Sequence, residues 1–203
     1  MLKSKLLLGM CLLLFFAGAP TEPGYKVGDA VKDFELKAVS GEMVSLDDYD
    51  DAKGFILIFD CNTCPYSQAY LERIKALHSK YADQGFPVVA IQPNDPSRSP
   101  GDSFDKMVAY ADENGYEHAY LYDETQEVAR RFGATNTPHV YVLNKDDGKY
   151  VVNYIGAIDN NTRSAADADK KYVEDAVDAL LKGKKPEVTK TKAIGCTIKW
   201  KAS

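Results

Sequence analysis

Two cysteines three positions apart carry the clearest chemistry in this sequence. Cys61 and Cys64 form a C-x-x-C motif that directly follows an apolar run and precedes Pro65. A cysteine thiolate attacks disulfides and peroxides, and a second cysteine one helical turn away can attack the resulting mixed disulfide and release the product. The pair therefore predicts redox chemistry at sulfur.

The same spacing also occurs in zinc sites, which normally need a second pair of ligands at a suitable spacing. The three histidines, His78, His118 and His139, are scattered singly along the chain. We therefore favour redox chemistry over metal binding and expect neither a metal nor a cofactor. A structural disulfide without turnover stays open as a third interpretation.

A buried strand and a helix must position this motif. Residues 55–59 are continuously apolar, which is typical of a strand buried on both faces. Apolar residues then recur at helical spacing, and they are Tyr66, Tyr70, Ile74, Leu77 and Tyr81. The N-terminus of such a helix offers free N–H groups and partial positive charge, both of which stabilise a thiolate.

The rest of the chain alternates strands with helices, which predicts an α/β layered domain. Hairpins are expected over 34–46 and 139–155, single strands over 88–91 and 119–122, and helices near 104–111 and 172–180. Asp123 and Gln126 form a capping-box pattern that opens a further short helix. The tail over 186–203 shows no pattern that predicts an element.

The first residues have the pattern of a secretory signal peptide. Lys3 and Lys5 precede a short apolar run, and an A-x-A pattern ends at Ala19. We expect residues 1–19 to be removed and the mature protein to be exported to the periplasm. Cys11 offers a lipoprotein alternative, but bulky Met10 precedes it and the apolar run continues past it, so lipid anchoring is not expected.

The net charge limits the kinds of partner that the protein can bind. The net charge of −5 becomes about −7 once a signal with two lysines and no acids is removed. Because nucleic-acid binding requires a basic face, no nucleic-acid partner is expected.

Cys196 is the odd cysteine of the mature chain. It is either a third redox thiol that resolves oxidised Cys64 or a free cysteine that packs as a small hydrophobe, and the sequence leaves both open.

A second motif lies far downstream of the cysteines, where residues 132–138 read FGATNTP before an expected strand. With the C-x-x-C motif, this run resembles the thioredoxin superfamily, in which a cis-proline faces the two cysteines. The resemblance implies a thioredoxin fold over residues 20–185: a three-layer α/β/α domain with a central mixed sheet and an N-terminal hairpin extension. It also implies that Pro138 is cis and that Thr137 presents its backbone to a bound substrate, the alternative being an ordinary trans proline.

Four segments narrow the resemblance to the bacterial peroxiredoxin-like redoxin family, which is similar to alkyl hydroperoxide reductases and thiol-specific antioxidants. These segments read CNTCPY at 61–66, YDETQE at 122–127, GAIDN at 156–160 and GCTIKW at 195–200. The sequence departs from thioredoxin at Asp60, which replaces a tryptophan. It departs from the peroxiredoxin P-x-x-x-T-x-x-C pattern, read onto Cys64, at Leu57 and Cys61, so the threonine that orients a peroxide is missing.

The motifs and the resemblance leave three alternative functions. The favoured one is an exported thiol-disulfide oxidoreductase, in which Cys61 attacks a protein disulfide, Cys64 resolves it and Thr137–Pro138 bind the substrate strand. Its electrons would come from a thiol donor, with a membrane protein as one candidate. The second is a thiol peroxidase in which a hydroperoxide oxidises Cys64 to a sulfenic acid that condenses with Cys61 or Cys196. The third is a non-enzymatic module with a structural disulfide.

Overall fold

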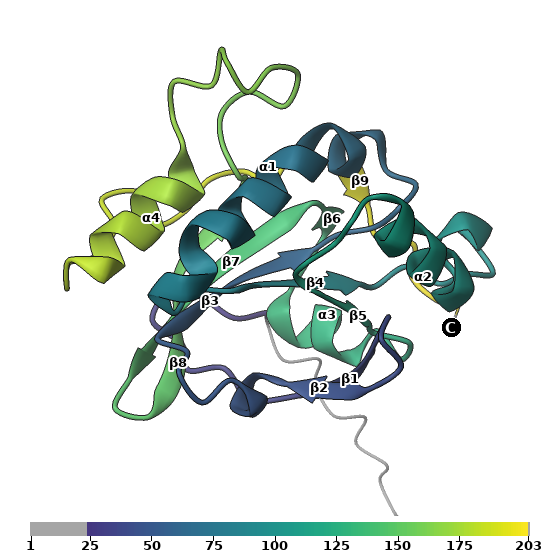
Figure 1. Ribbon diagram of the computed structural model, residues 1–203, viewed down its shortest axis with the longest axis horizontal. Helices are drawn as coiled ribbons and strands as arrows, with labels where there is room; N and C mark the ends of the chain where they lie inside the picture. The colour runs from purple at the N-terminus through teal and green to yellow at the C-terminus, as the bar shows by residue number, and fades with distance from the viewer. Residues whose placement is uncertain (1–23, 203) are drawn as a thin grey trace, which may run out of the picture.

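The structure is a computed structural model that describes residues 24–202 (Figure 1). The predicted signal peptide over 1–19 lies outside the described residues. Among the helices within 24–202, none is long and apolar enough to cross a membrane.

Seven strands form one mixed sheet in the order β2-β1-β5-β4-β3-β7-β8. Their bounds are β1 Glu35–Ala38, β2 Met43–Ser45, β3 Gly54–Phe59, β4 Val88–Gln92, β5 Ala119–Tyr122, β7 His139–Asp146 and β8 Lys149–Gly156. Strands β3, β4 and β5 run parallel, whereas β7, β8 and the N-terminal hairpin pair antiparallel. The N-terminal hairpin extension is present as expected, and β1 attaches it to the sheet at β5.

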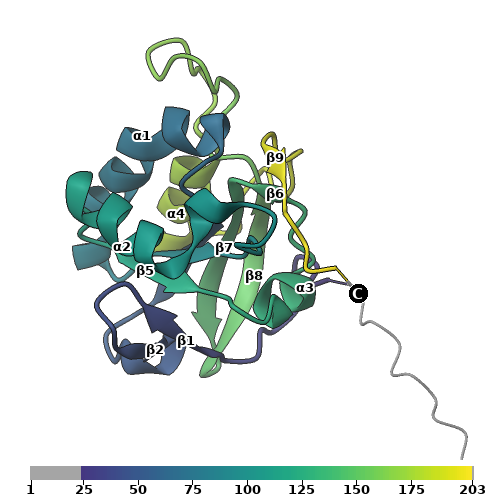
Figure 2. The same ribbon diagram turned by 90° about the vertical axis from the view of Figure 1, so that its right-hand side faces the viewer.

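Four α-helices cover the two faces of this sheet (Figure 2). They are α1 Pro65–Tyr81, α2 Phe104–Glu113, α3 Glu127–Phe132 and α4 Tyr172–Leu181. Helices α1 and α4 pack on one face, α2 joins them further along the same face, and α3 packs on the opposite face. The three-layer α/β/α architecture is therefore confirmed.

Strand β3 explains why its sequence is apolar without a break. Ile56 and Ile58 face the core under α1 and α4, whereas Phe55, Leu57 and Phe59 face the core under α3. Because helices cover both faces and β4 and β7 pair with its two edges, β3 does not meet solvent. This fully buried strand delivers the C-x-x-C motif at its C-terminal end.

Two details of the expected helices are wrong. Tyr66 does not belong to the buried face of α1, because its side chain is 40% exposed. The capping box at α3 does not form either: Gln126 is itself the N-cap residue, so Asp123 lies one turn too early. Asp123 still accepts the Ala129 N–H at 2.7 Å, but the Gln126 amide donates to the carbonyl oxygens of Pro93 and Lys199 instead of closing the box.

The C-terminal tail is structured and lies against the domain. Strand β9 (Cys196–Thr197) pairs antiparallel with β6 (Asn136–Thr137) as a small second sheet. Ile198 is buried in the core under α3, and the Trp200 ring packs against that core. The sequence shows no periodicity here because the tail pairs only in short pieces, with two residues on β6 and an isolated bridge between Lys190 and Ile155 of β8.

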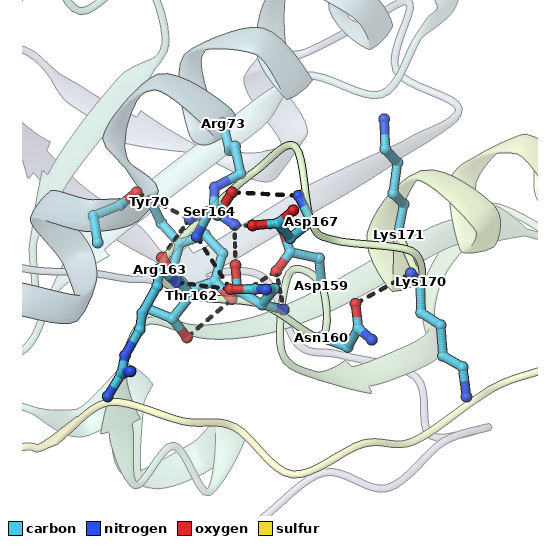
Figure 3. A network of polar contacts seen from close by, with 12 residues as sticks. Tyr70, Arg73, Asp159, Asn160, Thr162, Arg163, Ser164, Asp167, Lys170 and Lys171 are labelled. Atoms are coloured by element: carbon cyan, nitrogen blue, oxygen red, sulfur yellow. Dashed lines mark hydrogen bonds and ion pairs between the residues drawn. The ribbon is translucent and has the colours of Figure 1, made fainter.

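A polar network fixes the loop between β8 and α4 to the side of α1 (Figure 3). Arg73 donates to Asp159 at 2.6 Å and to the carbonyl oxygens of Asn161 and Thr162. The Tyr70 hydroxyl donates to the other Asp159 oxygen at 2.9 Å. Helix α1, which begins at the motif, is thereby tied to the loop as well as to the sheet.

Candidate active site

The two cysteines lie where β3 ends and α1 begins. Cys61 follows the strand by two residues, Cys64 is the N-cap residue of α1, and Pro65 is its first helical residue, as expected. Both thiols are almost completely buried, with 3% of Cys61 and 2% of Cys64 exposed. The motif is therefore held rigidly at the end of a 17-residue helix.

The segment before β7 meets the cysteines from the other side. The Thr137–Pro138 peptide bond is cis, as the resemblance implied. The Cys61 sulfur lies 3.1 Å from the Thr137 hydroxyl oxygen, and the protonated Cys64 thiol donates to the Thr137 carbonyl oxygen at 3.0 Å. The structure thus brings together all four residues expected at the site.

A buried carboxylate holds the loop between the cysteines. One oxygen of Asp102 accepts the backbone N–H groups of Asn62 and Thr63 at 3.0 and 3.1 Å. Its other oxygen accepts the Thr63 hydroxyl at 2.8 Å, the Asn94 amide at 2.8 Å and the Ser99 hydroxyl at 2.6 Å. Asp102 thereby satisfies loop donors that lie before the first turn of α1.

Sequence reasoning missed Asp102. It lies in a short 3-10 turn, Pro100–Asp102, on a proline-rich loop that carries no catalytic motif. The neighbouring Gly101 is needed for the close approach of this turn to the motif, because an added Cβ would lie 2.5 Å from the Thr63 methyl group. A close approach of that kind becomes visible only in the structure.

The surroundings of the pair favour Cys64 as the thiolate. The neighbouring Cys61 thiol, followed by Cys196 and the Ser67 backbone, holds the pKa of Cys64 well below its usual range. The pKa of Cys61 is raised, first by its hydrogen bond to Cys64, then by burial and by the Asp102 and Asp60 carboxylates. This polarity is the reverse of the expectation that Cys61 attacks.

Asp60 adds an unusual buried acid beside the motif. It is 3% exposed, and its Oδ1 atom has no hydrogen-bond partner among the described residues. Burial raises its pKa to about 7. An ionised Asp60 disfavours a thiolate on Cys61, so the proton of the reduced pair stays on that sulfur.

Cys196 also reaches the site. Its strand position is opposite Thr137, and burial, followed by its contact with Cys64, raises its pKa to about 11. Its side chain is only partly buried, unlike the other two cysteines of the described residues.

Comparisons with known proteins agree with this architecture. The model of the AhpC/TSA family matches residues 27–158. The thiol-disulfide oxidoreductase ResA of Oceanobacillus iheyensis is 35% identical over 71 residues, which cover 33% of this chain and 36% of ResA. The match thus spans about a third of that relative's length.

Two solved structures are similar over most of the chain. An uncharacterized conserved protein from Geobacillus kaustophilus is 33% identical, with a TM-score of 0.81 over 88% of this chain and 94% of its own. A hypothetical protein from Sinorhizobium meliloti is 31% identical, with a TM-score of 0.81 over 89% and 97%. The peroxidoxin BcpB of Mycobacterium tuberculosis, 20% identical with a TM-score of 0.55 over 70% of this chain and 92% of its own, shares the fold. The chain belongs to the AhpC/TSA family and is a redoxin of the thioredoxin superfamily.

Proposed function

We propose that the protein is an exported thiol-disulfide oxidoreductase whose working pair is Cys61 and Cys64. The observation that carries this proposal is the position of both sulfurs between the N-terminus of α1 and the cis Thr137–Pro138 segment. Export rests on the sequence of residues 1–19.

The chemistry starts at Cys64. Its thiolate attacks one sulfur of a disulfide, the S–S bond breaks, and the other sulfur leaves as a thiolate. The Cys61 sulfur then attacks Cys64 in the mixed disulfide, forms the Cys61–Cys64 bond and releases the second substrate thiolate. The proton that Cys61 held passes to a leaving sulfur, and the substrate gains the two electrons that the pair gives up.

A thiol peroxidase is the second candidate, and one observation favours it. Strand β9 already pairs with Thr137, so an extended polypeptide cannot pair there while β9 is in place, whereas a hydroperoxide is small. The Cys64 thiolate would attack the terminal peroxide oxygen, breaking the O–O bond to give a sulfenic acid and an alcohol. Attack by Cys61 would then form the disulfide and release water.

The test compares two substrates with one donor. The chain without residues 1–19 is supplied with dithiothreitol, and consumption of insulin disulfides and of hydrogen peroxide is measured for the wild type, Cys61→Ser and Cys64→Ser. Insulin reduction that both substitutions abolish is the expected result. Peroxide turnover that needs Cys64, without insulin reduction, would replace the first candidate by the second. Activity that survives Cys64→Ser would overturn both.

A further inference from the structure

The C-terminal strand occupies the place beside the cis-proline where a peptide could add to β6. In the register of β9 on β6, Cys196 pairs with Thr137 and Thr197 pairs with Asn136. The approach is close: a Cβ on Gly195 would lie 2.1 Å from the Thr137 carbonyl oxygen. The Asn136 amide also donates to the Gly195 carbonyl oxygen at 2.9 Å. This is strand addition of the kind by which proteins bind extended peptides.

Contacts after Cys196 hold the strand in this register. The Ile198 N–H donates to the Thr135 carbonyl oxygen at 3.1 Å, and the side chain is 4% exposed. The Lys199 N–H donates to Asn94 at 2.8 Å, and the Lys199 carbonyl oxygen accepts the Gln126 amide at 2.9 Å. The same Gln126 side chain accepts the Lys201 N–H at 2.7 Å. These contacts fix β9 beside the two cysteines.

This strand brings a partly exposed thiol to two buried ones. Cys196 lies opposite Thr137, whose carbonyl oxygen accepts the Cys64 thiol at 3.0 Å, so both cysteines lie against the same residue. Each of the two thiols also shifts the pKa of the other. Cys61 and Cys64 are almost inaccessible, whereas Cys196 is only partly buried. A macromolecular thiol that approaches from solvent thus meets Cys196 before it can meet Cys64.

We propose that β9 is the protein's own substrate strand, and that Cys196 is a third catalytic thiol through which an external thiol re-reduces the buried pair. This proposal rests on the proposed function, because it starts from the Cys61–Cys64 disulfide which that function generates.

The relay has two exchanges. Cys196 attacks the Cys64 sulfur, the Cys61–Cys64 bond breaks as the Cys64–Cys196 bond forms, and the proton of Cys196 passes to the released Cys61 sulfur. An external thiolate then attacks the Cys196 sulfur and expels Cys64 as a thiolate. A second thiol of the donor attacks the mixed disulfide, frees Cys196 and leaves the donor oxidised. The donor loses two electrons and the protein gains them.

The order of thiol acidities suits the second exchange. Exchange is faster when the leaving sulfur has the lower pKa, and Cys64 has the lowest pKa of the three cysteines. Attack on the more exposed sulfur therefore also expels the better leaving group. Burial is the first cause of the raised pKa of Cys196 and its contact with Cys64 is the second. The second cause is lost when Cys64 is in a disulfide, so the pKa of Cys196 is then lower.

The first test traps the relay intermediate. Cys61→Ser is oxidised with diamide, remaining thiols are alkylated, and peptides are mapped without reduction. A cross-link within one chain between Cys64 and Cys196 is expected. Its absence, with both residues recovered alkylated, would overturn the proposal. Because this readout needs no turnover, it is separate from the test of the proposed function.

The second test measures the rate of re-reduction. Oxidised wild type, Cys196→Ser and the matched control Thr197→Ser, on the same strand, are mixed with reduced thioredoxin as the protein dithiol, and disulfide loss is followed by alkylation and mass spectrometry. Cys196→Ser is expected to slow reduction at least about tenfold, whereas Thr197→Ser keeps the wild-type rate. Equal rates for all three proteins would overturn the relay while leaving the Cys61–Cys64 function intact.

Discussion

At the residue scale, the central feature is a pair of buried sulfurs with unlike surroundings. Cys64 is the N-cap residue of α1, and the neighbouring Cys61, Cys196 and Ser67 lower its pKa. Cys61 faces the carboxylates of Asp60 and Asp102. When the reduced pair loses one proton, the negative charge therefore falls on Cys64 and the remaining proton stays on Cys61.

This polarity predicts the pH dependence of alkylation. Cys64 is expected to react with iodoacetamide at a lower pH than Cys61, because the pKa of Cys64 is lowered whereas that of Cys61 is raised. Mass spectrometry of labelled peptides between pH 3 and 9 measures this. In Cys61→Ser the midpoint should rise, because the thiol donor is replaced by a more weakly acidic hydroxyl. Preferential labelling of Cys61 at pH 6 would contradict the assignment.

Asp60 predicts a loss of stability as the pH rises. Its pKa is about 7 in the folded protein and near 3.8 when unfolded, so the folded state binds its proton more tightly. The carboxyl has no effect below about pH 4, and its cost grows between pH 4 and 7 as the unfolded state alone ionises. Asp60→Asn should therefore gain stability over the wild type across this window, by up to a few kcal/mol.

Urea unfolding at pH 4, 5.5 and 8 measures this difference. Asp51→Asn, at an exposed carboxylate, is the matched control. A gap between Asp60→Asn and the wild type that stays constant with pH would contradict the buried-acid account.

Asp102→Ala tests the carboxylate that holds the motif loop. The substitution leaves the N–H groups of Asn62 and Thr63 and the Asn94 amide without their acceptor. Each buried unsatisfied group costs about 1–3 kcal/mol, so a total loss of at least about 3 kcal/mol is expected, with lower turnover per folded molecule. Stability and activity measured together check this, and exposed Asp105→Ala is the control. Equal effects of the two substitutions on stability and activity would show that Asp102 does not hold the motif loop.

At the scale of elements, α1 carries the motif and is held by the Arg73–Asp159 pair. Arg73→Met leaves the buried Asp159 carboxylate without its cation, so a loss of about 3 kcal/mol is expected. Glu72→Gln on the same helix breaks an exposed pair with Lys75 at 3.4 Å but keeps the hydrogen bond from Lys75 to the Asn114 carbonyl oxygen, and it should cost less than about 1 kcal/mol. Chemical denaturation measures the free energy of unfolding of both variants. Equal losses of stability would show that the Arg73–Asp159 pair does not anchor α1.

Most elements could be predicted because their burial follows a simple period. The unbroken apolar run of β3 and the three- and four-residue steps of α1 each predict burial. Asp102 could not be found this way, because it acts on backbone groups about forty positions earlier. Pairing of β6 with β9 involves two residues on each strand, too few for any periodicity to predict.

At the scale of the whole molecule, the C-terminal strand β9 covers the β6 edge beside the two cysteines. The resemblance to thioredoxins predicted the cis Thr137–Pro138 bond and its place beside the cysteines. It did not predict that β9 would pair with Thr137, because that depends on where the last residues of the chain pack. Peptide access at this edge therefore depends on the tail.

The central claim is that Cys61 and Cys64 form a reversible, working disulfide. Its most direct test is a redox titration of the chain without residues 1–19, in which the Cys61–Cys64 bond is quantified by alkylation and mass spectrometry across thiol–disulfide buffers. The account predicts a two-electron transition with a midpoint between about −120 and −270 mV, the range of catalytic pairs. A bond that stays intact until below about −300 mV, as structural disulfides do, or no bond at all, would contradict it.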